Sequence, residues 1–120
     1  MVVSDGGQNL ILTPYTVCWS NSTGGMCSDG RPPNPLPTLG RVSSPILVRF
    51  PASGWKFSAS QRQVAADAKR LRMQVRAVDD TTGELGSYGS QGRYDVKLFG
   101  RGPQGDVSVA FTMTTMTSSR

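Results

Sequence analysis

The segment GRYDVKLFGRGPQGDVSVAFTM, which runs from Gly92 to Met113, decides the fold of this 120-residue chain. Apolar and polar residues alternate on both sides of a turn-forming sequence at Arg101–Gly105. The apolar positions are Tyr94, Val96 and Leu98 before the turn, and Val107, Val109, Phe111 and Met113 after it. A period of two is typical of a β-strand with one buried face. The segment therefore predicts a hairpin that packs one side on a core.

Shorter apolar runs precede this hairpin and predict further strands. These runs are Asn9–Thr13, Tyr15–Ser20, Pro45–Phe50, Trp55–Ala59, Leu71–Ala77 and Leu85–Tyr88. A turn at Pro51–Gly54 predicts that the third and fourth runs form a hairpin across the core, and Thr82–Gly83 is a second turn signal. The stretch Ser28–Gly40 contains four prolines and predicts an extended surface connection.

The segment Ser60–Leu71 allows two interpretations. Val64, Ala68 and Leu71 lie at helical spacing, which favours a short helix. The alternation that begins at Leu71 favours a strand, and the preceding residues then form a loop or a single helical turn.

About seven strands without an internal repeat predict an all-β chain folded as an antiparallel β-sandwich. Fourteen glycines and eight prolines agree with frequent turns, and the length fits a single domain over residues 1–120. The sequence Gly92-x-Tyr94-x-Val96 resembles the start of a strand in immunoglobulin-like domains, where a tyrosine bends back to bond an upstream backbone group. We therefore predict an Ig-like topology, with an ordinary core tyrosine as the alternative.

Two cysteines, Cys18 and Cys27, lie nine positions apart around Gly24 and Gly25. The glycines let the chain turn back and bring the thiols to bonding distance. A metal site is a poor alternative because the chain has no histidine, and two unrelated free thiols would fit an intracellular protein. The sequence predicts a short-loop disulfide and therefore an oxidising compartment.

The N-terminal sequence bears on export. VVSDGGQ follows Met1 and is polar too early for a signal peptide, and no apolar stretch approaches the ~20 residues of a membrane span. Together with the predicted disulfide, this indicates a secreted or cell-envelope protein whose export signal has been trimmed away before Met1.

Four segments carry a family resemblance: PYTVCW (Pro14–Trp19), CSDGRPP (Cys27–Pro33), FPASGWKFSA (Phe50–Ala59) and GRYDVKLFGRGPQGDVSVAFTMTT (Gly92–Thr115). Together they resemble exported proteins and lipoproteins of unassigned function from high-GC Gram-positive bacteria. The resemblance spans most of the chain except Ser60–Gly89. It implies an exported domain, and lipid anchoring of the full-length protein through a cysteine upstream of Met1. It implies no biochemical activity, and the chain lacks the anchor itself.

Catalysis is disfavoured because the chain has no histidine, the commonest general base near neutral pH. Asp79 and Asp80 are adjacent, so they do not face each other across a cleft as a glycosidase pair would. No motif places a serine beside a lysine. The segment Asp79–Glu84 offers oxygen ligands at alternate positions but lacks the full series of a calcium loop. We expect no catalysis, no cofactor and no metal ion.

The formal net charge of +5 favours contact with anionic surfaces. The basic residues are spread along the chain without a dense run, so a role in solubility is the simpler explanation. Arg70, Arg72 and Arg76 come closest to a cluster, and Arg72 and Arg76 are expected to share a strand face. Stacking aromatics are absent from this stretch, and with the expected export this disfavours nucleic acid as a partner.

Two tryptophans are candidates for stacking on sugar rings. Trp55 shares a strand face with Phe57, which favours core packing. Trp19 neighbours the disulfide and is expected either to bind a ligand or to pack over the sulfurs. The sequence thus predicts a monomeric or weakly dimeric binding module of the cell envelope and leaves its partner open between an envelope protein and a cell-wall polymer. The alternative partner is an anionic wall polymer or glycan, held by Trp19, Arg70, Arg72 and Arg76.

Overall fold

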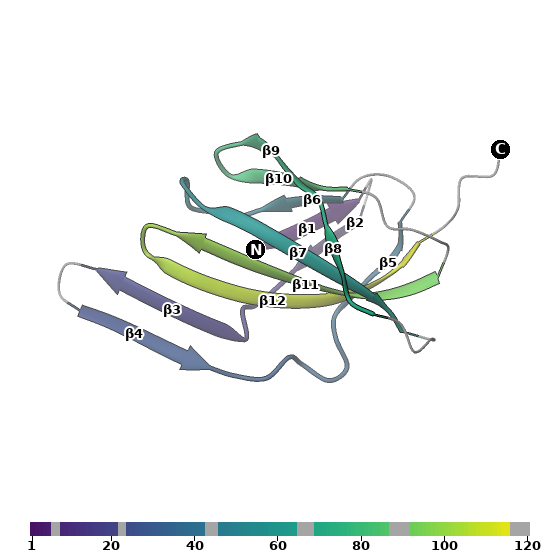
Figure 1. Cartoon of the computed structure of the whole chain (residues 1–120), viewed down its shortest axis with the longest axis horizontal. Helices are drawn as coiled ribbons and strands as arrows, with labels where there is room; N and C mark the ends of the chain where they lie inside the picture. Colours follow the sequence, from purple (N-terminus) through teal and green to yellow (C-terminus); the bar gives the residue numbers. More distant parts are fainter. Residues whose placement is uncertain (6–7, 22–23, 43–45, 65–68, 87–91, 116–120) are drawn as a thin grey trace.

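The fold consists of two β-sheets packed face to face. A computed structural model describes residues 1–5, 8–21, 24–42, 46–64, 69–86 and 92–115, without the side chains of 21 and 41. The five-stranded sheet has the order β2-β1-β6-β10-β9, with β1 (Val2–Asp5), β2 (Gln8–Ile11), β6 (Ile46–Arg49), β9 (Val75–Asp79) and β10 (Thr82–Leu85). The predicted all-β sandwich is confirmed (Figure 1).

The seven-stranded sheet has the order β4-β3-β12-β11-β7-β8, and β5 pairs with β12. Its members are β3 (Thr16–Asn21), β4 (Gly24–Asp29), β5 (Thr38–Val42), β7 (Lys56–Gln63), β8 (Leu71–Met73), β11 (Gly92–Gly102) and β12 (Gly105–Thr115). Within the described ranges, every strand pair is antiparallel except β5 beside β12. Twelve strands in these ranges exceed the roughly seven that were predicted.

The predicted C-terminal hairpin is confirmed and forms the centre of the seven-stranded sheet. β11 pairs with β12 from Gly92↔Thr115 to Gly102↔Gly105. Its alternating side chains point into the space between the sheets, where they meet Val3, Ile46 and Val48 of the other sheet. The hairpin side chains buried there are Tyr94, Val96, Leu98, Val109, Phe111 and Met113. The last residues, 116–120, lie outside the described part.

The predicted hairpin between Pro45–Phe50 and Trp55–Ala59 is wrong. β6 pairs with β1 and β10 in the five-stranded sheet, whereas β7 pairs with β11 and β8 in the other. The connection between β6 and β7 passes from one sheet to the other. Phe50 and Trp55, at the two ends of this connection, are buried against each other with ring centroids 4.5 Å apart. The two apolar runs therefore cross from one layer to the other.

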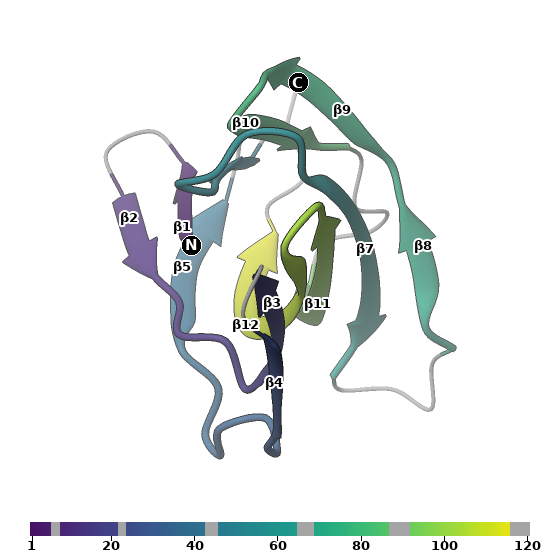
Figure 2. The ribbon, with the colours of Figure 1, turned by 90° about the vertical axis from the view of Figure 1, so that its left-hand side faces the viewer.

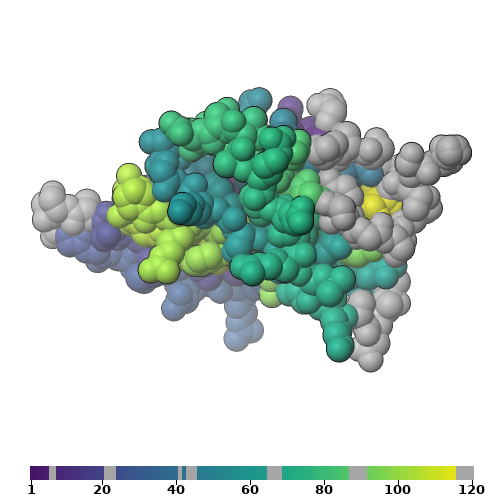
Figure 3. Space-filling model, turned by 45° about the horizontal axis from the view of Figure 1, so that its top comes forward, coloured from purple at the N-terminus to yellow at the C-terminus, as the bar shows by residue number. Residues whose placement is uncertain are grey.

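The predicted single strand Leu71–Ala77 is two strands. β8 pairs with β7 in one sheet and β9 pairs with β10 in the other, with Gln74 between them. Figure 2 shows β8 leading into β9 along one side of the molecule and carrying the chain between the sheets. Figure 3 shows the green β9 and β10 lying beside the teal β7, with the lime end of the β11–β12 hairpin next to it. The alternating sequence Leu71–Ala77 therefore contributes one strand to each sheet.

Three shorter predictions also need correction. The turn lies at Asp80 and Thr81, where the Asp79 side chain accepts a hydrogen bond from the Thr81 amide at 2.9 Å. It does not lie at Thr82–Gly83, because both residues belong to β10.

The proline-rich stretch Ser28–Gly40 is a surface connection only in its middle, since its ends belong to β4 and β5. β7 continues through Ser60–Gln63, where a loop or helical turn was predicted. Residues 65–68 and 87–91, including the end of the predicted strand Leu85–Tyr88, lie outside the described ranges.

Candidate functional site

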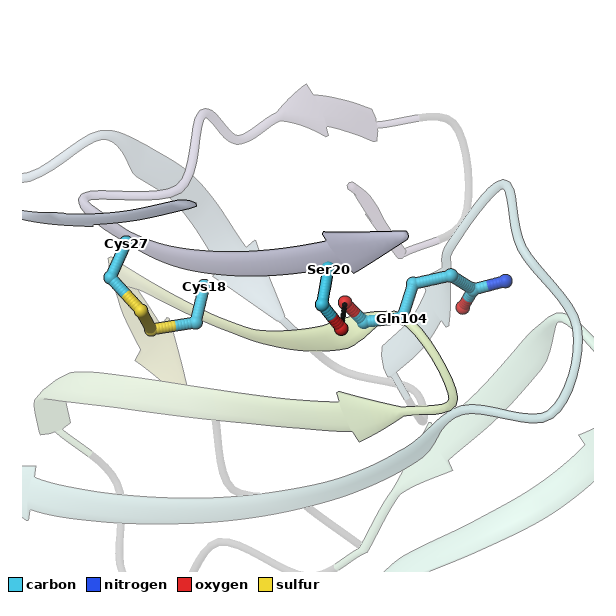
Figure 4. The surroundings of a disulfide bond; sticks show 4 residues. All are labelled: Cys18, Ser20, Cys27 and Gln104. Carbon is cyan, nitrogen blue, oxygen red and sulfur yellow. Dashed lines mark hydrogen bonds between the residues drawn. A yellow bond between two sulfur atoms is a disulfide. The ribbon is translucent and has the colours of Figure 1, made fainter. Parts of the chain in front are cut away.

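The disulfide joins neighbouring strands of a β-hairpin. Cys18 of β3 lies directly opposite Cys27 of β4, with a Cα–Cα distance of 4.1 Å and an S–S bond of 2.08 Å. The Ser20 amide and hydroxyl both donate to the Gln104 carbonyl oxygen, at 2.6 and 3.3 Å, which ties the hairpin to the β11–β12 turn (Figure 4). The predicted disulfide is confirmed.

The outer strand of this hairpin has little packing to hold it. All six residues of β4 are exposed, and Figure 1 shows β3 and β4 at the edge of the sheet, away from the other layer. β4 therefore depends on its pairing with β3 and on the disulfide.

Replacing Cys18 and Cys27 by alanine is expected to loosen β4 while the rest of the sheet stays folded. A disulfide closing so short a loop contributes ~2–3 kcal/mol in the chain-entropy model. Amide hydrogen exchange in Gly24–Asp29 should therefore accelerate about 30- to 150-fold. Amides at the centre of the β11–β12 ladder serve as the internal control. Equal acceleration in both regions would show that the bond supports the whole fold instead.

Trp19 packs on a second tryptophan and not on the sulfurs. Its ring stacks on Trp55 with centroids 5.8 Å apart, and 41% of Trp19 is exposed. Trp55 is buried, as predicted, and its indole N–H donates to the Gln104 side-chain oxygen at 2.9 Å. Trp19 thus continues an aromatic cluster at one end of the sandwich.

Two glycines of β11 make room for this cluster. A Cβ at Gly102 would lie 2.5 Å from three indole atoms of Trp55, and one at Gly100 would lie 2.5 Å from the Phe57 ring. The core-facing positions of β11 are therefore glycines where the Trp55 and Phe57 rings pack against the strand, and bulky residues elsewhere. This arrangement explains the sequence Gly100-Arg101-Gly102 as a packing requirement.

The outer face of the seven-stranded sheet concentrates positive charge. Strand alternation and register place six basic side chains there, and the groove described below adds two from flanking segments. We call these eight residues the basic face: Arg31, Lys56, Arg62, Arg70, Arg72, Arg93, Lys97 and Arg101. The same alternation places three acidic residues on this face, Asp29, Asp95 and Asp106.

Eight basic and three acidic residues leave an excess of five positive charges, equal to the formal net charge of the whole chain. The remaining basic and acidic residues number five each. Charges that are spread along the sequence thus gather on one face of the described part of the chain. Strand pairing brings together charges that are far apart in the sequence.

A groove runs along the basic face in two adjoining parts that share Lys97. One part, of ≈ 630 Å³, lies against the proline-rich segment and is lined by Arg31, Asn34, Arg62, Arg70 and Asp95 among others. The other part, of ≈ 450 Å³, is lined by Tyr15, Ser58, Ser60, Arg72, Phe99 and Ser108 among others. We call the two parts together the basic groove.

The groove's cations are only partly paired with protein groups. Arg62 lies 3.6 Å from Asp95, and Arg70 donates to the Ser60 carbonyl and hydroxyl oxygens at 3.3 and 3.1 Å. Partial burial, and secondarily the charge of Arg62, lower the pKa of Arg70 below its usual value. An arginine in this position nevertheless stays protonated at neutral pH. The groove therefore presents permanent positive charge to a ligand.

The structure divides the predicted arginines between the two sheets. Arg70 and Arg72 line the basic groove, whereas Arg76 lies on β9 in the other sheet and pairs with Glu84 at 2.9 Å. Arg72 and Arg76 still line a common surface hollow of ≈ 590 Å³ beside the groove. The prediction that Arg72 and Arg76 share a strand face is wrong, because the chain changes sheets at Gln74.

Sequence reasoning missed Lys97 and Phe99 as groove residues. Both occupy the polar-side positions of β11, opposite the core-facing Val96 and Leu98. The alternation that predicted the core also indicates that Lys97, Phe99 and Arg101 share the outer face. A phenylalanine at an outward-facing position was therefore the available sign of a binding surface.

Other site classes find no support in the described residues. No group of three or more histidine, cysteine, aspartate or glutamate residues there could hold a metal ion, and no helix there could cross a lipid bilayer. Asp79 is engaged in its own turn, where hydrogen bonds from Thr81 and Thr82 lower its pKa. Comparison of the chain with family models, curated proteins and solved structures finds no match.

Proposed function

We propose that this chain is a non-catalytic binding module that holds an anionic polymer on its basic face. The observation that carries the proposal is the gathering of eight basic side chains, from segments between Arg31 and Arg101, on one side of one sheet. Such a surface attracts a polyanion from a distance and makes several salt-dependent contacts with it. Of the two partner classes that the sequence predicts, the wall polymer fits this surface better than an envelope protein.

The disulfide supports the location of the proposed activity. A protein that keeps this bond works in an oxidising environment, such as the bacterial cell surface. Membership in the exported family, the lipid anchor, the Ig-like topology and a monomeric or weakly dimeric state belong to the same proposal. The sequence upstream of Met1 would test the export and the lipid anchor. The strand order of the complete domain would test the Ig-like topology, and the mass of the protein in solution would test its oligomeric state.

The proposal is tested by removing two groove cations at once. Arg72→Ala combined with Lys97→Ala should weaken binding to heparin and to purified teichoic acid about ten- to a hundredfold. The slope of log Kd against log salt concentration should fall by about 2, since two ionic contacts are lost. The matched control is Arg49→Ala combined with Arg76→Ala, which removes the same net charge from the five-stranded sheet.

The control variant should retain nearly full affinity. Equal losses in the two double variants would mean that net charge, and not the basic face, determines binding. If the unmodified protein binds neither polymer at 50 mM salt, the proposed function is wrong.

A further inference from the structure

Phe99 stands out on the basic face as an apolar side chain without apolar neighbours beside it in the sheet. It lies on β11, an inner strand of the seven-stranded sheet, and is 41% exposed. The residues directly opposite it are Ser58 on β7 and Ser108 on β12. Neither serine is large enough to cover a phenyl ring, so the ring is left open to a ligand.

Cations flank this ring along its own strand. Lys97 and Arg101 lie two residues before and after Phe99 on the same face, at roughly 6.5–7 Å along the strand. Arg72 lines the same part of the groove from β8. The ring is therefore placed between groups that would hold the acidic substituents of a polymer.

Hydroxyl groups complete the lining around the ring. Ser58, Ser60, Ser108 and Tyr15 surround this part of the groove, whose ≈ 450 Å³ falls within the range of small-molecule sites. An aromatic ring offers its face to the C–H surface of a sugar, while hydroxyls bond the sugar's own hydroxyls and cations take its acidic groups. A chain of bare phosphates would use the cations alone.

We propose that Phe99 is the stacking platform of a subsite for one sugar unit of an acidic polysaccharide, with Lys97 and Arg72 holding its acidic substituents. This inference rests on the proposed function and specifies the class of polymer. Single-stranded nucleic acid could also stack on Phe99. The polysaccharide is favoured because the disulfide fits an oxidising compartment, where extracellular glycans are found.

The test compares two polyanions, heparin, which consists of acidic sugar rings, and inorganic polyphosphate, which contains none. Phe99→Ala should weaken heparin binding about tenfold and leave polyphosphate binding unchanged within about twofold. Lys97→Ala should weaken both. Ile11→Ala removes an apolar side chain that is 77% exposed on the other sheet, and it should weaken neither.

Four results would overturn the inference. Equal losses for both polymers in Phe99→Ala would assign the ring a structural role, and no loss for either would exclude stacking. Tighter binding of oligo-dT than of heparin, lost in Phe99→Ala, would assign the site to nucleic acid. If the unmodified protein binds teichoic acid but not heparin, this inference fails while the proposed function stands; if it binds neither of these two polymers at 50 mM salt, the proposed function fails too.

Discussion

Replacing Val3 by aspartate is expected to remove a large part of the stability of the fold. Val3 is fully buried in β1, which lies between β2 and β6 in the five-stranded sheet. A carboxylate there would be placed between the two layers, among apolar side chains and far from water. The free energy of unfolding should fall by about 4 kcal/mol or more, a large part of the 5–15 kcal/mol typical of a domain.

Val2→Asp is the matched control, one residue away on the opposite face of the same strand. Val2 is only half-buried, so its carboxylate keeps contact with water. Urea unfolding followed by tryptophan fluorescence should give a midpoint near that of the unmodified protein for Val2→Asp and a much lower midpoint for Val3→Asp. An unchanged midpoint for Val3→Asp would mean that β1 is dispensable and that its neighbours close the sheet without it.

This prediction depends on a strand that the sequence did not reveal. Val2–Asp5 contains two apolar residues followed by polar ones, too few to show a period. β1 pairs with β2, which begins only three residues after β1 ends, and with β6, which is so distant in sequence that no local pattern records the contact. The long alternating segment Gly92–Met113 was predictable because eleven cross-strand pairs form around one short turn.

Alternation shows which side chains share a face but does not show to which sheet a strand belongs. β8 and β9 keep one alternating pattern, yet Met73 packs in the core from one sheet and Val75 contacts that core from the other. For the same reason the arginines at 72 and 76 were placed together although they lie in different layers. The proximity of the charged residues on β7, β8 and β11 could not be predicted without knowing how these strands pair and in which register.

The disulfide was easier to predict than the groove, and the reason is physical. Two cysteines around a pair of glycines form a local constraint within a single hairpin. The basic face depends on two strand pairings, β7 with β11 and β7 with β8, and on the proline-rich segment lying over the sheet. Exposed residues such as Phe99 and Lys97 carry the evidence for function, whereas the patterns that predict strands come from the buried ones.

Gly105→Ala is expected to lower the free energy of unfolding by about 3 kcal/mol. Gly105 begins β12 with φ +147°, a conformation that residues with a side chain rarely adopt. A Cβ there would also overlap the carbonyl oxygen of Cys18 on β3, which pairs with β12 at this point. Relief would require β3 to move away from β12, with the stacked Trp19 and Trp55 rings moving apart.

Gly25→Ala makes the matched comparison within the same pair of hairpins. A Cβ at Gly25 would meet no atom closer than 3.6 Å, an ordinary contact, so its stability should change by less than about 0.5 kcal/mol. Thermal unfolding gives both stabilities, and near-ultraviolet circular dichroism reports the tryptophan pair. A Gly105→Ala protein with unchanged stability and an unchanged tryptophan signal would show that β3 can shift without disturbing the aromatic cluster. The disulfide-bonded hairpin would then be attached to the sandwich by strand pairing alone.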